Sequence, residues 1–268
     1  MPLTSIPSSP ISSPEDSETS FSESASPASS HPEPDFSRRA DLVELMDQPC
    51  SYEELRACLH DIARVNRLTF AYRPTISWLE RLLASHPQSA GPLRVVDVGC
   101  GFGDALRQTE AWAAKRGIAV ALTGIDLNPD AIRAAREATL PTQRIEWIVG
   151  DALSCAAQSE IDVVLCSLLT HHLTDSQIVQ FLRWMEQTSR CGWFINDLHR
   201  QPMPYHLFRL LARFTNWHRF VKNDGPVSIR RSFVVKDWQD LCAAAQLDAT
   251  NVSIKECRPA RLCVGRIK

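Results

Sequence analysis

The sequence VVDVGCGFG, residues 95–103, joins a short apolar run directly to three closely spaced glycines. The run begins at Leu93, and its mainly apolar character is typical of a strand that is buried on both faces of a parallel sheet. A helical pattern from Asp104 to Arg116 follows the glycines. Since glycine lets the backbone turn sharply and lets a ligand approach closely, the stretch predicts a strand–turn–helix unit whose turn is a binding loop.

Strands and helices alternate along the chain after this unit. The next four predicted strands are VALTGIDL (120–127), RIEWIVGDA (144–152), IDVVLCSLL (161–169) and CGWFINDL (191–198), and helical patterns follow the first and the third of these four. This alternation predicts a parallel sheet with right-handed crossovers. The last two strands, 251–257 and 261–267, are separated by only three residues, a connection that can join only antiparallel strands. The predicted fold class is therefore α/β: a doubly wound, Rossmann-like three-layer sandwich, whose mostly parallel seven-stranded sheet has an antiparallel C-terminal edge.

Composition divides the chain into three parts. Residues 1–37 contain thirteen serines, seven prolines and six acidic residues but no Lys or Arg, which predicts a disordered tail. Residues 38–90 show three amphipathic helical stretches, the first at Leu42–Met46, and predict an N-terminal helical cap. Residues 91–268 form the predicted α/β domain, and residues 202–231 interrupt its rhythm as an inserted lid.

Charge and hydropathy exclude several classes of partner. Without the tail, 29 basic residues face 25 acidic ones, a surplus too small for a typical nucleic-acid binder. No segment reaches the roughly 18 apolar residues that span a bilayer, and the N-terminus does not resemble a secretory signal. The nine cysteines include no CxxC pair, so we expect reduced core thiols, no metal site and a cytoplasmic protein. The oligomeric state is not predicted.

Acidic residues stand at the ends of three predicted strands. Asp126 and Asp151 are placed to accept hydrogen bonds from the ribose and the adenine of a nucleoside. Asp97 precedes the first glycine by two residues and favours a cofactor with a positive charge, such as a sulfonium, over a pyrophosphate. The glycines are spaced G-x-G-x-G, whereas dinucleotide-binding proteins use G-x-G-x-x-G. This pattern predicts a nucleoside cofactor that carries a sulfonium.

The motifs VVDVGCGFG, GIDLNPD, VGDA and DVVLCSLLTHHL together resemble the class I S-adenosylmethionine-dependent methyltransferases, and within them the small-molecule group. The resemblance covers residues 93–198 and implies S-adenosylmethionine as the cofactor. It also implies which residues bind that cofactor: Asp97, Gly99 and Gly101 near its methionine part, Asp126 and Leu127 at the ribose, Asp151 and Ala152 at the adenine, and Ser167 in the pocket wall.

Three histidines are candidate catalytic bases. A base is needed only if the acceptor must lose a proton, as a phenol or another hydroxyl does. His171 and His172 follow the fourth strand at the expected mouth of the crevice, where they either remove this proton or only shape the pocket. His199 follows the fifth strand and is either a base or a surface residue. Arg73 is a further candidate, for the carboxylate of the cofactor.

The inserted segment offers the best place for substrate specificity. Its apolar stripe is predicted to be a lid over an apolar or aromatic substrate, a helix at residues 202–221 in weak contact with a membrane surface, or a helix packed on its own core. Asp224-Gly225 further along predicts a turn. The stripe consists of Leu207, Leu210, Leu211, Phe214, Trp217 and Val221.

The sequence thus predicts a methyltransferase for a small apolar or aromatic acceptor, with O-methylation of a hydroxyl preferred. The alternatives are C-methylation of a quinone-like or polyketide ring, an NAD(P)-dependent oxidoreductase, and a non-catalytic binding protein with a methyltransferase fold. A nucleic-acid methyltransferase is disfavoured because the fourth strand ends in Cys166-Ser167-Leu168-Leu169 rather than in an NPPY-type motif.

Overall fold

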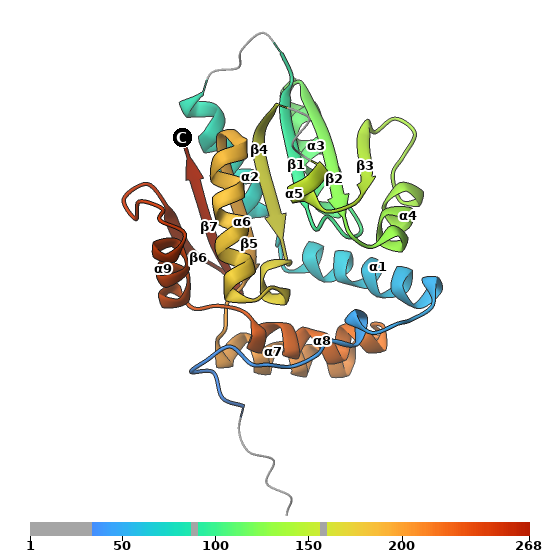
Figure 1. Ribbon diagram of the computed structural model, residues 1–268. Coiled ribbons are helices and arrows are strands. Elements are labelled where there is room, and N and C mark those ends of the chain that lie inside the picture. The colour runs from blue at the N-terminus through green and yellow to red at the C-terminus, as the bar shows by residue number, and fades with distance from the viewer. Residues whose placement is uncertain (1–33, 87–90, 156–159) are drawn as a thin grey trace, which may run out of the picture. The chain divides into compact units, whose positions relative to one another are not determined.

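The computed structural model describes residues 34–86, 91–155 and 160–268 and confirms the predicted α/β fold. One seven-stranded sheet has the strand order β3-β2-β1-β4-β5-β7-β6 (Figure 1). The strands are β1 (Leu93–Val98), β2 (Val120–Asp126), β3 (Ile145–Val149), β4 (Ile161–Ser167), β5 (Ser189–Leu198), β6 (Ser253–Cys257) and β7 (Arg261–Ile267).

The direction of the strands determines where a ligand can bind. Strands β1 to β5 pair in parallel, whereas β7 is antiparallel to both β5 and β6. The chain runs outward from β1 to β3 and then returns to place β4 on the other side of β1. In open α/β sheets such a switch point opens a crevice at the carboxyl ends of the strands. The glycine loop after β1 lies at this point.

Two apolar cores pack against the two faces of the sheet, so both faces of its central strands are buried. Adjacent residues of β1 point into different cores, Val95 into one and Val96 into the other. Helices α2 (Arg73–Ser85), α3 (Asp104–Arg116) and α4 (Pro129–Glu137) contribute to the core around Val95. The core around Val96 includes residues from α5 (Ala152–Cys155), α6 (Asp175–Thr188) and α9 (Val235–Ala244).

Three further helices lie across the carboxyl edge of the sheet (Figure 1). They are α1 (Tyr52–Leu68), α7 (Pro202–Phe214) and α8 (Arg219–Arg231). The capping box at Ser51 and Glu54 begins α1. The first predicted helical stretch, at Leu42–Met46, is wrong: apart from the 3₁₀ turn η1 (Leu45–Asp47), this segment is not helical. Its apolar residues are too few to form a buried helical face before Pro49.

Residues 35–48 form a segment that we call the N-terminal strap. It runs along α7 and α8 (Figure 1), where Phe36 stacks edge to face on Tyr205 and the backbone of Ala40 bonds to Arg230. The backbone amides of Leu45 and Met46 donate to the carboxylate of Asp224, at 2.8 and 3.0 Å. These contacts place the strap over the carboxyl edge of the sheet. Most of the predicted disordered tail, residues 1–33, lies outside the described residues.

The predicted lid consists of two helices rather than one. The predicted turn at Asp224-Gly225 is wrong, because both residues lie inside α8. The Asp224 side chain accepts hydrogen bonds from the backbone of the strap. A Cβ at position 225 would lie 2.2 Å from the Phe208 ring, so glycine at this position allows α7 and α8 to pack closely. The predicted stripe divides accordingly: Trp217 and Val221 are buried, whereas the four apolar residues on α7 are exposed. No described helix is long and apolar enough to cross a membrane.

Candidate active site

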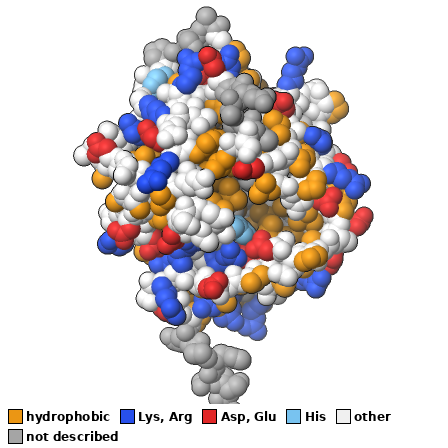
Figure 2. All heavy atoms as spheres, in the orientation of Figure 1, with side chains coloured by type: hydrophobic (Ala, Val, Ile, Leu, Met, Phe, Trp, Pro, Cys, Tyr) orange, Lys and Arg blue, Asp and Glu red, His pale blue; other side chains and the backbone are white. Residues whose placement is uncertain are grey.

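A cavity of about 810 Å³ opens at the carboxyl edge of the sheet. This volume falls within the range of ligand pockets in proteins. Figure 2 shows it as a hollow with largely hydrophobic walls and a histidine at its edge. Its lining includes every predicted site residue except His199 and Arg73: Asp97, Gly99, Gly101, Asp126, Leu127, Asp151, Ala152, Ser167, His171 and His172.

The glycine loop holds a conformation that other residues rarely adopt. Gly99, Gly101 and Gly103 all have positive φ angles, of 67°, 50° and 72°. The backbone amide of Gly101 donates to Asp126 Oδ2 at 2.8 Å, and the amide of Asn128 donates to Asp126 Oδ1 at 2.9 Å. Asp126 thus ties the loop to the end of β2. Burial raises the pKa of its carboxyl group, and these two amides act against that rise.

Replacing Gly103 by alanine is expected to lower the free energy of unfolding by about 2–5 kcal/mol. A Cβ there would lie 2.1 Å from the Trp147 indole, so overpacking adds to the backbone strain of a positive φ. Gly117→Ala is the matched control, because Gly117 has φ +65° but no other atom within 4 Å of the place where its Cβ would lie. Urea unfolding of both variants measures the difference. Equal losses would show that Trp147 makes no close contact with position 103.

Asp97 is the most deeply buried acid of the loop, with 2% of its surface exposed. Burial, and then the nearby charges of Asp104 and Asp126, raise the pKa of its carboxyl group well above the usual range. A cation bound in the cavity would stabilise the ionised form of this group. The position therefore suits a positively charged ligand better than an anionic one.

An arginine that the sequence analysis did not select stands in the wall beside the loop. Arg261 at the start of β7 is buried, and its Nη2 donates to Asn66 Oδ1 of α1 at 2.8 Å. Arg73, which was predicted for this role, lies outside the cavity lining, and its guanidinium stacks over Phe70 at 3.9 Å from the ring centroid. Its position at the start of α2 directs it to that ring rather than to the cavity.

The residues that were predicted to contact the adenine, the ribose and the pocket wall also lie in the cavity lining. The Asp151 carboxylate accepts from the amide of Leu153 at 3.1 Å and so caps α5, while the neighbouring Ala152 is buried. Leu127 is 73% exposed. The Ser167 hydroxyl donates to the carbonyl oxygen of Asn196 at 3.3 Å. That these residues contact a cofactor stays a prediction.

His171 forms a buried pair with Asp197, near the end of β5. Its Nδ1 lies 2.7 Å from Asp197 Oδ1, and its backbone amide and the Thr170 hydroxyl donate to Oδ2. Burial acts to raise the pKa of Asp197, but His171, the Thr170 hydroxyl and the Leu198 amide together hold it below the usual range. Because an ionised carboxylate can only accept hydrogen bonds, Nδ1 carries a proton, and in the neutral imidazole Nε2 is then the acceptor. Asp197 was missed, although it is another acid near a strand end.

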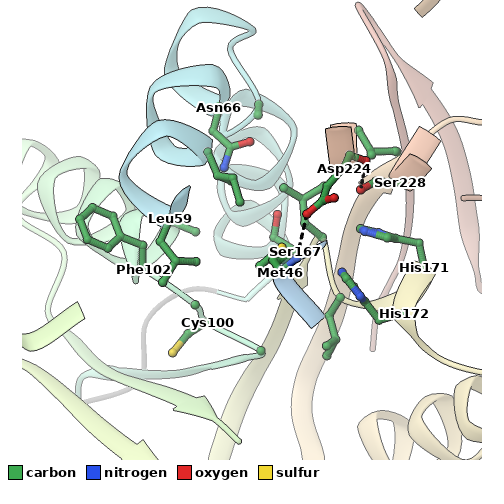
Figure 3. Close-up of a pocket in the computed structure, with 18 of the residues that line it drawn as sticks. Met46, Leu59, Asn66, Cys100, Phe102, Ser167, His171, His172, Asp224 and Ser228 are labelled. Carbon is green, nitrogen blue, oxygen red and sulfur yellow. Dashed lines mark hydrogen bonds between the residues drawn. The ribbon is translucent and has the colours of Figure 1, made fainter. Parts of the chain in front are cut away.

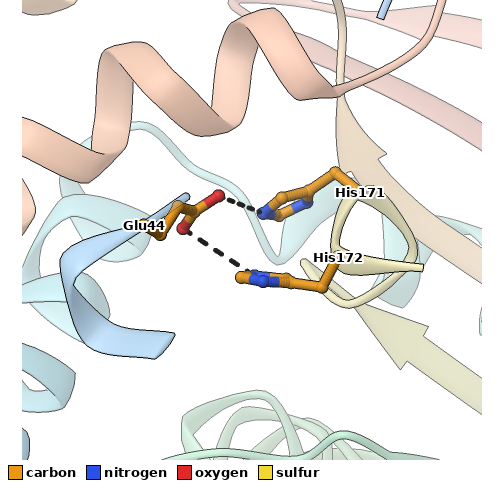
Figure 4. Close-up of side chains that lie close together, drawn as sticks. All are labelled: Glu44, His171 and His172. Carbon is orange, nitrogen blue, oxygen red and sulfur yellow. Dashed lines mark ion pairs between the residues drawn. The ribbon is translucent and has the colours of Figure 1, made fainter. Parts of the chain in front are cut away.

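Glu44 of the N-terminal strap is the third residue that the sequence analysis missed. It is 1% exposed, and burial raises the pKa of its carboxyl group to about 7. Its Oε1 lies 3.7 Å from both His171 Nε2 and Arg231 Nη1, and its Oε2 lies 3.8 Å from His172 Nε2. Figure 4 shows its carboxylate facing both imidazole rings. We call Glu44, His171 and His172 the polar wall.

The polar wall lies on one side of a space whose opposite side is largely apolar. Figure 3 shows both histidines close to Asp224 and Ser228 of α8, with Leu59 and Phe102 on the other side of the cavity. Further apolar residues of this part of the lining come from the strap and from α1, α7 and α8: Met46, Leu55, Ile62, Leu207, Phe208, Val221 and Ile229.

His199 is not part of this arrangement. Its backbone amide donates to the carbonyl oxygen of Ala260, and its backbone forms an isolated β-bridge with Phe233. Its Nε2 lies 3.3 Å from Nε2 of Gln201. These backbone contacts hold the ring outside the cavity lining. Burial lowers the pKa of His199. The structure therefore does not bring His199 together with the other predicted catalytic residues.

Comparison with known proteins gives one family match, two similar folds and one short sequence match. Residues 95–192 match the model of a methyltransferase domain family. The plantazolicin methyltransferase BpumL, solved with a triazolic desmethylPZN analog and SAH, has a similar fold: the TM-score is 0.59, with 15% identity, over 81% of this chain and 96% of that chain. LepI, solved with SAM, gives a TM-score of 0.50 and 17% identity, over 71% of this chain and 46% of that chain.

One curated protein is similar in sequence over a short region. The non-reducing polyketide synthase tazA of Aspergillus terreus is 34% identical over 83 residues. These residues make up 31% of this chain but only 3% of the synthase. The similarity therefore concerns a small part of that protein.

Proposed function

We propose that this chain, which contains a class I S-adenosylmethionine-dependent methyltransferase domain, methylates an acidic hydroxyl group on a small, largely apolar acceptor. The observation that carries the proposal is the position of the His171–Asp197 pair. Within this pair, His171 lies in the lining of the same cavity as the glycine loop, so that a proton acceptor and the cofactor loop both face the acceptor space, while Asp197 lies behind the ring.

The cofactor half of the cavity suits S-adenosylmethionine in its charge. Asp97 faces the sulfonium, while Asp126 accepts from the ribose hydroxyls and keeps the loop in place. Asp151 and Ala152 bind the adenine, and Ser167 lies in the wall. Arg261 binds the carboxylate of the methionine part, since it is the buried cation beside the loop.

The acceptor half is largely apolar, and its polar groups include the polar wall and the neighbouring Asp47, Asp224 and Ser228. The apolar side chains of α1, α7 and α8 remove a ring or an alkyl chain from water, and their contact with it orients the hydroxyl towards the polar wall. The proton leaves the hydroxyl at this wall, where Nε2 of His171 is free to accept it. The oxygen then attacks the methyl carbon, the bond from that carbon to sulfur breaks, and S-adenosylhomocysteine remains. Alignment of the three atoms supplies much of the rate.

A second candidate is C-methylation of an enolisable carbon. The similarity to the polyketide synthase favours it, because polyketide chains carry such carbons between two carbonyl groups. The polar wall suits either acceptor, since a phenol and an enolisable carbon both lose a proton and both place the resulting charge on oxygen.

Labelled S-adenosylmethionine with a trideuterated methyl group tests the proposal. The purified chain is incubated with a panel of phenols, hydroxyquinones and β-diketones, and products are followed by mass spectrometry. Carbon–proton correlation spectra then distinguish an O-methyl from a C-methyl group. We expect a labelled phenol ether, or a labelled carbon for the second candidate. Binding of the cofactor without a labelled product from any phenol or enol would contradict both and favour a non-catalytic role.

A further inference from the structure

The polar wall has ligand atoms that converge without bonding to one another. One atom each from Glu44, His171 and His172 lie within 4.8 Å of one another. The separations of 3.7 and 3.8 Å between the carboxylate oxygens and the two Nε2 atoms are too long for hydrogen bonds. Around a tetrahedral ion that binds its ligands at roughly 2.0–2.2 Å, however, neighbouring ligand atoms lie about 3.3–3.6 Å apart. Each Nε2 is therefore close to the distance from a Glu44 oxygen that two ligands of one ion would have.

A buried carboxylate oxygen without a hydrogen bond gives a second indication, because Arg231 Nη1 lies 3.7 Å from it, beyond hydrogen-bond distance. Glu44 Oε1 has no hydrogen-bond partner among the described residues, and Glu44 is only 1% exposed. A buried acceptor that lacks a partner costs about 1–3 kcal/mol, and more if it is charged. The strap nevertheless holds this carboxylate in place, because Asp224 accepts the amides of the two residues that follow it.

Both imidazole rings are oriented as in metal sites. His171 Nδ1 lies 2.7 Å from Asp197, and His172 Nδ1 lies 3.3 Å from Asp47. A histidine that binds a metal usually donates its other N–H to a carboxylate, which fixes the tautomer and the direction of the ring. Here the same arrangement occurs twice, and in both rings it leaves the Nε2 lone pair directed at Glu44.

The local charge suits a divalent cation. With Glu44 ionised, the state that a bound cation favours, Glu44, Asp47 and Asp197 carry three negative charges, and Arg231, whose Nη1 lies 3.7 Å from Glu44 and 3.4 Å from Asp47, carries one positive charge. The net charge of these four groups is then two negative charges. Arg39, the other arginine near His171, forms an ion pair with Asp175 instead.

We propose that Glu44, His171 and His172 bind one divalent transition-metal ion, such as Zn²⁺, whose open coordination positions face the acceptor half of the cavity. Imidazole and carboxylate ligands suit such ions, and three protein ligands leave room for another oxygen. The role of the ion rests on the proposed function. It binds the acceptor oxygen and withdraws electron density, so the oxygen loses its proton to solvent before the methyl group is transferred. His171 then contributes as a ligand rather than as the base.

Calorimetric titration with Zn²⁺ tests the site directly. The full chain is first freed of metal by dialysis against a chelator, and the expected result is one equivalent bound with micromolar or tighter affinity. Glu44→Gln keeps the shape of the side chain but loses its charge, and we expect at least a 10-fold weaker affinity. His206→Ala is the control, because His206 is an exposed histidine on α7 outside the polar wall. It should leave the affinity unchanged.

Two results would overturn the metal site: no Zn²⁺ binding by the unaltered chain, or binding that Glu44→Gln does not weaken. The spectrum of the Co²⁺-loaded chain is a second readout, since its visible bands should change in Glu44→Gln. Methyl transfer that survives both chelation and this substitution would refute the role of the ion in the reaction but leave the proposed function standing. Zn²⁺ binding without methyl transfer to any phenol or enol would support the site and refute the proposed function.

Discussion

Replacing Asp126 by alanine is expected to weaken the binding of S-adenosylmethionine about 100-fold or more. The carboxylate loses two roles at once: it no longer accepts from the ribose hydroxyls, and it no longer holds the amides of Gly101 and Asn128. Hydrogen bonds to a charged group contribute about 1.5–3 kcal/mol each, and 1.4 kcal/mol corresponds to a factor of ten in affinity.

Calorimetric titration of the purified chain measures this effect. Asp126→Asn keeps one acceptor oxygen and should weaken binding less than alanine does. Glu146→Ala is the matched control, since Glu146 is an exposed acid on the adjacent strand β3 and is not in the cavity lining. NAD and NADP should not bind. Tight binding of S-adenosylmethionine by Asp126→Ala, or binding of NADP by the unaltered chain, would contradict the assignment of this half of the cavity.

Replacing His171 by asparagine is expected to lower kcat about 10²- to 10⁴-fold. The asparagine amide can still donate to Asp197, so that the buried carboxylate keeps a partner, but no imidazole Nε2 remains in the polar wall. Proton removal from the acceptor therefore loses its principal group, whether the imidazole acts as the base or as a metal ligand. The affinity for S-adenosylmethionine should stay within about twofold, because the loop residues are unchanged.

His172→Asn separates the two mechanisms. If His171 acts alone as a base, the loss of His172 should affect kcat far less than the loss of His171. If both bind one ion, either substitution should lower kcat and Zn²⁺ affinity together. Single-turnover measurements with a labelled acceptor follow the chemical step. An unchanged kcat in His171→Asn would remove this residue from the reaction altogether.

The sequence predicted the cavity-lining residues best where they lie at the carboxyl ends of strands. Asp97, Asp126 and Asp151 each terminate or adjoin a strand with a clear apolar pattern, and the parallel sheet brings those ends to one edge. The same reasoning would have found Asp197, which is also near a strand end. The sequence analysis selected His199 after the same strand instead, but backbone contacts with Ala260 and Phe233 hold the His199 ring outside the cavity lining.

Glu44 could not be predicted, because no periodicity connects it to the sheet. It lies in a mostly irregular strap, and only the tertiary contact with Asp224 brings it to the cavity. Asp224 in turn was mistaken for a turn residue, since Asp-Gly usually marks one, whereas here helix packing against Phe208 requires the glycine. The apolar stripe of the lid likewise gave no sign of its interruption between Phe214 and Arg219, where the first helix ends and the second begins.

The strap also has a consequence for the order in which the chain can fold. Asp47 of the strap and its partner His172 are 125 residues apart, and the strap's other contacts reach Asp224 and Arg230, still later in the sequence. Such distant contacts form only after the entropy of closing a long loop has been overcome. During synthesis the strap leaves the ribosome well before α7 and α8, on which it docks. The polar wall is therefore completed only in a chain whose sheet and α8 are already in place.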